Sequence, residues 1–190
     1  MSDRVHLGFA GRFIALKGHK LLIEATAQAL AAGAPIHLHL AGDGPLLEDV
    51  KSQVCQAGIG ENVTIHGRIP RASMSAFYQN LDIYVSPSYF EGLPVTFLEA
   101  MASGLPIIST RIDATQGVIS AKTGILTEVG SAPELARAMI ALAGRPEQRI
   151  SLGRHAREEA ETKYNWDTIA ADQVAIYARY LAATPDRHLV

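Results

Sequence analysis

Residues 83–109 read IYVSPSYFEGLPVTFLEAMASGLPIIS and decide the fold class of this chain. Two short apolar runs, residues 83–86 and 106–109, are typical of buried strands. Between them, residues 94–103 have the spacing of a helix that opens with proline and stops at Gly104. The segment is therefore a strand–helix–strand unit, which places its two strands parallel in one sheet.

The alternation of strands and helices extends from this segment in both directions. Apolar runs predict further strands at residues 5–10, 36–41, 63–66 and 124–126. Amphipathic spacing predicts further helices at residues 17–32, 45–57, 71–81, 133–142, 147–164 and 166–183. Because such alternation builds parallel sheets covered by helices, we expect an α/β fold. It would be a three-layer, Rossmann-like domain with a six-stranded parallel sheet and helices on both faces.

In open sheets of this kind, ligands bind beyond the carboxyl ends of the strands, near the point where the strand order reverses. The loops that follow the predicted strands begin near Gly11, Gly42, Gly67, Pro87 and Thr110. Functional residues are therefore expected in these loops.

Composition and charge restrict the class of protein. The 190 residues carry 17 Lys and Arg against 19 Asp and Glu, which argues against a dominant nucleic-acid interface. The single cysteine, Cys55, excludes a disulfide within the chain and is expected to be a small buried residue of a helix. No apolar run is long enough to span a bilayer, and the N-terminus has no signal-peptide pattern. We therefore expect a cytoplasmic protein, with contact at the inner face of the cell membrane left open.

Gly11, Arg12, Lys17 and Gly18 follow the first predicted strand and open the first helix. Gly11 allows a ligand to approach the backbone closely. Arg12 can hold phosphate oxygens in a fork and Lys17 adds a point charge, so the pair suits a diphosphate. The alternative is a solvated helix start that carries two unrelated cations, since charged helix ends are common.

Glu91 and Glu99 flank the most informative helix start. Pro94 is expected to be the first helical residue. This start places Glu91 in the loop before the helix and Glu99 in its second turn, so that both can face one cleft. The amides of Leu93, Val95 and Thr96 would form an anion site. Ionised carboxylates accept hydrogen bonds, and sugar hydroxyls donate them. The alternative is a surface loop followed by an acidic helix.

Four further groups are less specific. Residues 42–45, Gly-Asp-Gly-Pro, form either a tight turn or a ligand contact through Gly42. Residues 66–70, His-Gly-Arg-Ile-Pro, line a base pocket or simply leave a strand. His37 and His39 share a strand face but have no third ligand nearby in sequence, so no metal site is predicted. Aromatic residues of the last two helices are expected to pack rather than to bind a ligand: Tyr164, Trp166, Tyr177 and Tyr180.

Taken together, these motifs resemble one known family. Residues 11–18, 42–45, 67–70 and 91–106 occur in the order found in the carboxyl-terminal domain of the group 1, family-four retaining glycosyltransferases, which have the GT-B fold. The resemblance runs from about residue 5 to residue 180. Its most specific part is the pair of glutamates separated by seven residues and followed by Ala-Met-Ala-Ser-Gly-Leu-Pro.

The resemblance implies that Arg12, Lys17 and Glu91 act in catalysis. The two cations would hold the donor diphosphate and stabilise its departing charge, while Glu91 would contact hydroxyls of the transferred sugar. Glu99 would bind the ribose of the nucleotide. The other implied donor-binding residues are Gly11, Gly42, Arg68, Ile69, Leu93, Val95 and Thr96. The donor is a substrate, with a UDP-sugar favoured over a GDP-sugar, and neither a metal nor another cofactor is implied.

The resemblance also implies a larger enzyme with two Rossmann-like domains and the active cleft between them. Residues 1–190 would be the donor domain alone. Residues 165–190 would form a helix that packs on the N-terminal, acceptor-binding domain and exposes apolar surface here. We expect an excised domain or one subunit of a split enzyme, which binds the nucleotide-sugar and transfers little sugar alone.

The implied reaction is hexosyl or N-acetylhexosaminyl transfer to a glycan or lipid-linked acceptor, in cell-surface polysaccharide or lipopolysaccharide synthesis. Any peripheral membrane contact would belong to the full-length protein. Many relatives carry Gly-Gly-x-Pro-Glu where residues 111–115 here read Arg-Ile-Asp-Ala-Thr, so the sugar itself is not predicted.

Two other functions remain open: a non-catalytic nucleotide-binding or interaction module of the same fold, and a sugar-nucleotide epimerase. The presence of Arg12, Lys17, Glu91 and Glu99 favours the transferase over the module. The glutamate block argues against the epimerase.

Overall fold

A computed structural model of the protein describes residues 4–92 and 94–183. Its strands are β1 Val5–Ala10, β2 Ile36–Ala41, β3 Val63–Gly67, β4 Ile83–Ser86, β5 Ile107–Thr110 and β6 Gly124–Thr127. They form one six-stranded sheet in the order β3-β2-β1-β4-β5-β6, and each neighbouring pair is parallel. The order therefore reverses between β1 and β4, and the predicted sheet is confirmed.

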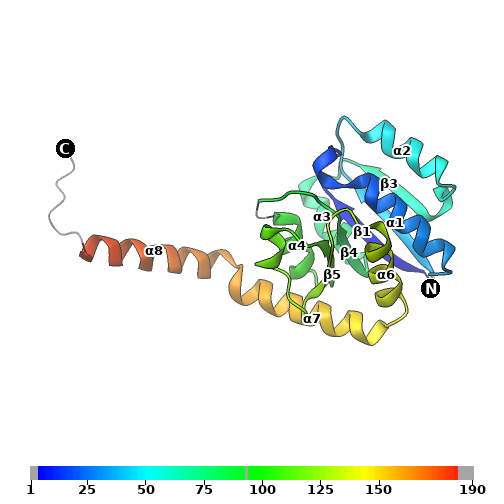
Figure 1. The fold of residues 1–190 in the computed structure, drawn as a ribbon. Helices are drawn as coiled ribbons and strands as arrows, with labels where there is room; N and C mark the ends of the chain where they lie inside the picture. Colours follow the sequence, from blue (N-terminus) through cyan, green and yellow to red (C-terminus); the bar gives the residue numbers. More distant parts are fainter. Residues whose placement is uncertain (1–3, 93, 184–190) are drawn as a thin grey trace.

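Helices cover both faces of the sheet (Figure 1). The helices are α1 His19–Ala31, α2 Leu47–Gln56, α3 Met74–Gln79, α4 Val95–Ala102, α5 Asp113–Gln116, α6 Ala132–Ala143, α7 Pro146–Lys163 and α8 Trp166–Ala183, with short 3₁₀ turns η1 Ala15–Lys17, η2 Gly60–Asn62 and η3 Arg71–Ser73. One hydrophobic cluster joins α1, α2 and α6 to the sheet, and a second joins α3, α4 and α7 to the opposite face. This is the expected three-layer arrangement.

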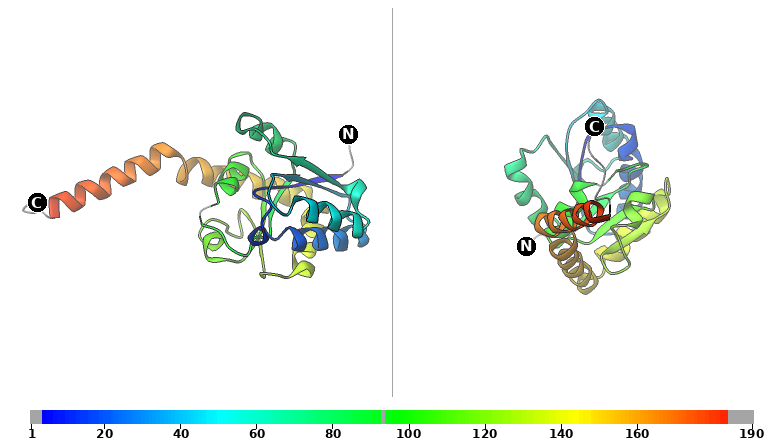
Figure 2. Two further views of the ribbon diagram at one scale, coloured as in Figure 1. Left: turned by 90° about the horizontal axis from the view of Figure 1, so that it is seen from above. Right: turned by 90° about the vertical axis from the view of Figure 1, so that its left-hand side faces the viewer.

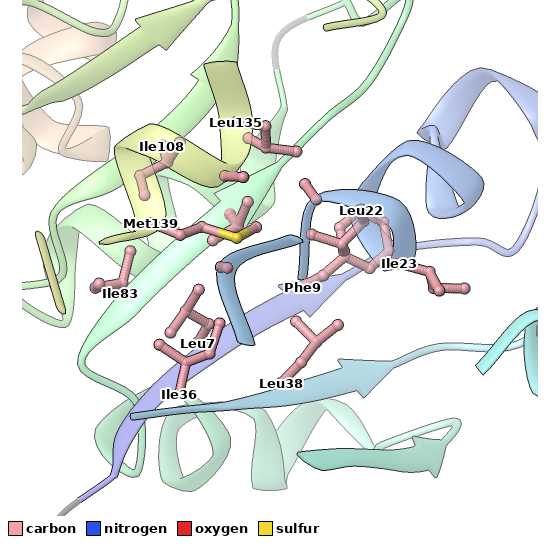
Figure 3. Close-up of a cluster of buried hydrophobic side chains, with 14 of the residues drawn as sticks. Leu7, Phe9, Leu22, Ile23, Ile36, Leu38, Ile83, Ile108, Leu135 and Met139 are labelled. Carbon is pink, nitrogen blue, oxygen red and sulfur yellow. The ribbon is translucent and has the colours of Figure 1, made fainter. Parts of the chain in front are cut away.

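The first cluster depends on the alternation of side chains along β1 and β2. Leu7 and Phe9 of β1 point to the same face as Leu38, which is the register partner of Leu7 (Figure 3). Leu22 of α1 and Met139 of α6 close over them, and each of these five side chains is at most 1% exposed. Such close packing holds the central strands rigidly, so the loops at their carboxyl ends have a fixed base.

Four helices, α1 to α4, begin later than predicted, and each follows one of the loops in which functional residues were expected. α1 starts at His19 because Gly18, with φ 67°, ends the separate turn that contains Lys17. α4 starts at Val95, so the prediction that Pro94 is the first helical residue is wrong. The proline ring sets φ at −76° but leaves ψ free, and ψ is extended at 102°.

Two local features differ from the sequence analysis. Cys55 is exposed, and the prediction of a buried thiol is wrong, because Val50 and Val54 form the buried side of α2. The short helix α5 was not predicted, since four residues are too few to show a helical period.

The last helix, α8, projects away from the rest of the domain (Figures 1 and 2). Its aromatic side chains are exposed, with Trp166 at 84%, Tyr177 at 60% and Tyr180 at 63%, so the expectation that they pack is wrong. The expected exposure of apolar surface on this helix is confirmed, and Tyr164 before it does pack on the second cluster. Across residues 4–92 and 94–183, every helix falls short of the length and apolar character that a bilayer span requires.

Histidines from three strands meet on the second face of the sheet. Nδ1 of His6 lies 2.9 Å from Nε2 of His39, whose Nδ1 lies 3.0 Å from Nε2 of His66. The sequence paired only His37 with His39, because partners on flanking strands are distant along the chain. Burial first, and then the three neighbouring histidines, lower the pKa of His39 to about 4. In the part of the chain that the structure describes, no group of three or more His, Cys, Asp or Glu residues could hold a metal ion.

His19, in the first turn of α1, is 3% exposed and lies against the rings of Phe9 and Phe13, at centroid distances of 4.8 and 4.4 Å. Burial lowers the pKa of His19 from 6.5 to about 4, with the Ile14 backbone opposing the shift and Lys17 adding to it. The unfolded chain therefore binds this proton more readily than the folded chain. The contribution to stability is complete above pH 6.5 and is lost as the pH falls toward 4.

We expect the His19→Leu variant to lose less stability than the wild type on acidification. Each pH unit below the unfolded pKa destabilises the wild type by about 1.4 kcal/mol through this group, whereas leucine keeps apolar contacts and does not titrate. Urea unfolding at pH 7.5, 5.5 and 4.5 measures the difference. The control His155→Gln, at an exposed histidine, should keep the wild-type pH dependence. An identical pH dependence in His19→Leu and wild type would refute the prediction.

Candidate functional site

A cavity of about 720 Å³ opens beside the carboxyl ends of β1, β2 and β3. The start of α4, which follows β4, closes its other side, so the cavity lies where the strand order reverses. Seven of the residues predicted to bind a donor line it: Gly11, Arg12, Gly42, Arg68, Ile69, Thr96 and Glu99. The sheet topology thus brings together residues that are far apart in the sequence.

Glycines allow the loops after β1 and β2 to touch along their backbones. Gly42 has φ 140°, and a Cβ atom there would lie 1.8 Å from the carbonyl oxygen of Gly11. A Cβ atom on Gly44 would lie 2.6 Å from the carbonyl oxygen of Phe13. The N–H of Phe13 in turn donates a hydrogen bond of 2.9 Å to the carbonyl of Asp43. The sequence left a tight turn and a ligand contact as alternatives for residues 42–45. In the structure this loop both packs tightly on its neighbour and lines the cavity.

Three arginines line the cavity, from two different loops. Arg12 follows β1, whereas Arg68 and Arg71 follow β3. Arg71 and its neighbour Met74 were not predicted as site residues. Their only signal in the sequence is their position shortly after a strand, in a segment that reads as the start of an ordinary helix.

Lys17 and Glu91 form an ion pair, and neither residue is among those that line the cavity. Nζ of Lys17 lies 2.6 Å from both carboxylate oxygens of Glu91, and the side chains are 22% and 9% exposed. Ser88 donates a second hydrogen bond to Glu91 at 2.7 Å. Because the lysine charge is already paired, Lys17 and Glu91 neutralise one another in the ligand-free chain.

The loops after β1 and β4 are held together by their backbones. The Tyr89 N–H donates to the Leu16 carbonyl at 2.8 Å. A Cβ on Gly18 would lie 2.1 Å from the Pro87 carbonyl oxygen, so this approach requires glycine. The contact explains how Lys17 reaches Glu91, although 74 positions separate them along the chain.

Glu99 reaches the cavity from the second turn of α4, as the sequence predicted. Its carboxylate accepts a hydrogen bond of 2.8 Å from the buried phenol of Tyr78. Burial, and next the neighbouring Tyr84 and Glu99, raise the pKa of Tyr78 far above its usual range. The phenol therefore stays protonated and remains a donor near neutral pH.

The remaining residues of the predicted anion site are placed less uniformly. Thr96 lines the cavity. Val95 does not line it and is 62% exposed. The amides of both residues belong to the first turn of α4, where N–H groups lack carbonyl partners within the helix. Leu93 lies outside the described residues.

With this geometry established, comparison with known proteins identifies the family. The family model described as "Glycosyl transferases group 1" matches residues 4–145, most of the chain. This chain is a member of the group 1 glycosyltransferases. The D-inositol 3-phosphate glycosyltransferase of Arthrobacter sp. (strain FB24) is 30% identical over 194 residues, which cover 100% of this chain and 46% of that relative.

Two solved structures support the same assignment. Sucrose-phosphate synthase from Thermosynechococcus elongatus is 29% identical, with a TM-score of 0.85 over 96% of this chain and 47% of that one. The C-terminal domain of the group 1 family protein LpcC from Francisella tularensis is 27% identical, with a TM-score of 0.78 over 85% of this chain and 87% of that one. The chain thus spans about half the length of these larger relatives.

Residues 111–115 are the segment at which the sequence departs from the pattern that the resemblance implies, and the structure shows their contacts. Arg111 lies 3.6 Å from Glu128 and lines a second cavity of about 500 Å³, beside β6. Thr115 donates to the Thr110 carbonyl at 2.7 Å and so fixes the start of α5. In this chain, therefore, Arg111 contributes to a different cavity from the one lined by Arg12.

We expect the Gly42→Ala substitution to destabilise the domain by about 2 kcal/mol more than Gly58→Ala, which is the usual size of an overpacking penalty. Both glycines have positive φ, which alone costs about 1–2 kcal/mol for another residue. Only Gly42 faces the Gly11 carbonyl, since nothing lies within 4 Å of a Cβ on Gly58. Urea unfolding measures both variants. Equal losses of stability would show that the loop contact is not needed.

Proposed function

We propose that this chain is the donor-binding domain of a retaining glycosyltransferase. It holds a nucleoside-diphosphate sugar, a UDP-sugar in preference to a GDP-sugar, while a hexosyl or N-acetylhexosaminyl group passes to a glycan or lipid-linked acceptor. The observation that carries the proposal is the convergence of Arg12, Glu99 and the first turn of α4 on one cavity at the reversal of strand order. Family membership and the glutamate block support the same reaction.

The groups around the cavity suit a diphosphate. Arg12 offers a planar fork of N–H donors, and Arg68 adds a second cation. The amides of Val95 and Thr96 add the partial positive charge of a helix N-terminus. As the bond between sugar and diphosphate breaks, negative charge grows on the departing nucleotide. Fixed cations and amides stabilise that charge without a metal ion, which makes them the proposed catalytic groups.

Binding of the donor changes the partners of Lys17 and Glu91 in this proposal. In the structure they are bound to one another, 2.6 Å apart. A diphosphate would compete with Glu91 for Lys17, and sugar hydroxyls would offer Glu91 donors in place of the ammonium group. The ion pair thus holds the two side chains together until the donor binds.

The acceptor site in this proposal belongs to a second, N-terminal domain that packs on α8. The exposed side chains of Trp166 and Tyr177 on the projecting helix α8 support this second domain, because contiguous exposed apolar surface marks a site of contact with another protein or domain. The chain alone then binds nucleotide but transfers little sugar. Any contact with the inner face of the cytoplasmic membrane, during polysaccharide or lipopolysaccharide synthesis, is proposed for the two-domain enzyme.

Calorimetric titration with UDP and GDP tests the binding site. We expect UDP to bind more tightly than GDP, and Arg12→Ala and Glu99→Ala to weaken UDP binding about tenfold or more, because each removes a hydrogen bond to or from a charged group worth about 1.5–3 kcal/mol. The control Arg137→Ala, at an exposed surface ion pair on α6, should bind as the wild type does. If the wild type binds neither nucleotide, the proposal is wrong.

A second titration tests the exchange of partners. The Glu91→Gln variant keeps the shape of the side chain but removes the charge that pairs with Lys17. We expect it to bind UDP about threefold to tenfold more tightly, because Lys17 becomes free to meet the diphosphate. Lys17→Ala should instead weaken UDP binding. An affinity for UDP that falls in Glu91→Gln would contradict the competition between the carboxylate and the diphosphate.

A further inference from the structure

Tyr78 is the side chain that anchors Glu99. Its Oη donates to Oε2 of Glu99 at 2.8 Å, and within residues 4–92 and 94–183 it is the sole side chain that hydrogen-bonds this carboxylate. Tyr78 lies on α3 and Glu99 on α4, so the bond joins two elements that follow different strands. Tyr78 is not among the residues that line the cavity, whereas Glu99 is.

The ring of Tyr78 is held in place from several sides. The residue is 1% exposed and belongs to the second hydrophobic cluster. Its ring meets Phe77 and Tyr84 edge-on, at centroid distances of 5.6 and 6.0 Å. A donor that cannot change rotamer holds its acceptor in one geometry with little further loss of entropy.

The two carboxylates of the glutamate block are supported differently. Glu91 is bound to the ammonium group of Lys17, which neutralises it. Glu99 is bound to a neutral phenol, which orients the carboxylate and leaves its negative charge. Hydrogen bonding at Oε2 also leaves Oε1 with its own lone pairs for a donor in the cavity. Glu99 is thus arranged to accept hydrogen bonds from hydroxyl groups, and its charge would repel a phosphate placed directly against it.

We infer that Tyr78 is a positioning residue, which holds Glu99 so that Oε1 accepts a hydrogen bond from the ribose diol of the bound nucleotide. The inference rests on the proposed function, because it assumes that a nucleotide occupies the cavity. It adds a residue that does not touch the ligand and assigns it a measurable effect on recognition of the ribose.

A purely structural role for Tyr78 predicts something different. The loss of a buried hydroxyl would then lower stability, or loosen the whole cavity, and all nucleotides would bind less well. A positioning role predicts a loss that depends on the ribose hydroxyls. The ratio of two dissociation constants, for a nucleotide with and without those hydroxyls, separates these roles.

The test uses calorimetric titration with UDP and with 2′,3′-dideoxy-UDP. In the wild type we expect UDP to bind about tenfold more tightly, the equivalent of one hydrogen bond to a charged group. In Tyr78→Phe the preference should fall to about threefold or less, through weaker binding of UDP, while the affinity for the dideoxy analogue stays within twofold. The matched control Tyr164→Phe removes a phenol that donates to the Gly117 carbonyl at 3.4 Å, and should keep the full preference.

A double-mutant cycle adds a second readout. In a Glu99→Ala background, the further change Tyr78→Phe should no longer alter the preference for UDP, because the group that Tyr78 positions is gone. Independent, additive effects of the two substitutions would overturn the inference.

Each remaining outcome is decisive. An unchanged preference in Tyr78→Phe, or equal weakening of both nucleotides, overturns the positioning role and leaves the proposed function intact. Absence of a preference in the wild type also overturns it, since Glu99 then does not read the ribose. If the wild type does not bind UDP at all, the proposed function itself is wrong.

Discussion

Backbone contact between Gly11 and Gly42 is the constraint on which the cavity depends. The N–H of Gly11 donates to the Ala41 carbonyl, and the N–H of Gly42 donates to the Gly67 carbonyl, so three strand ends are joined at one edge of the sheet. Without side chains on the two glycines, the loops lie in direct contact and their neighbours face a common space. Parallel strands supply this edge, and the reversal of strand order leaves room there for a ligand.

The charges at this edge fall into two groups. Arginines line the cavity itself together with Thr96 from the first turn of α4, and in the proposed function a diphosphate would be held there. Outside the cavity lining, Lys17 and Glu91 neutralise one another, while Tyr78 holds Glu99 without neutralising it. A site that binds an anion and hydroxyl groups together needs both signs of charge within a short distance. Glu91 is paired with Lys17, and Glu99 is oriented by a neutral phenol. The negative charge of Glu99 and the positive charges of the arginines are therefore both available to a ligand.

The six-stranded parallel sheet could be predicted from the sequence, because buried parallel strands give short apolar runs and the helices between them show the helical spacing of apolar residues. The sequence also singled out Arg12 and Glu99, both of which line the cavity, because ligands are expected near the loops that follow strands. It could not show the ion pair of Lys17 with Glu91 or the hydrogen bond from Tyr78, because both join residues from different βα units. The start of α4 was wrong by one residue because proline restricts φ and not ψ.

In the proposed function, one cavity holds both the diphosphate and the ribose of a nucleotide. A crystal structure of this chain with UDP would show both groups at once. We expect the diphosphate against Arg12 and the amides of Val95 and Thr96, with a ribose hydroxyl within hydrogen-bond distance of Glu99. UDP bound in the second cavity, beside β6 and Arg111, or bound with its ribose away from Glu99, would contradict it.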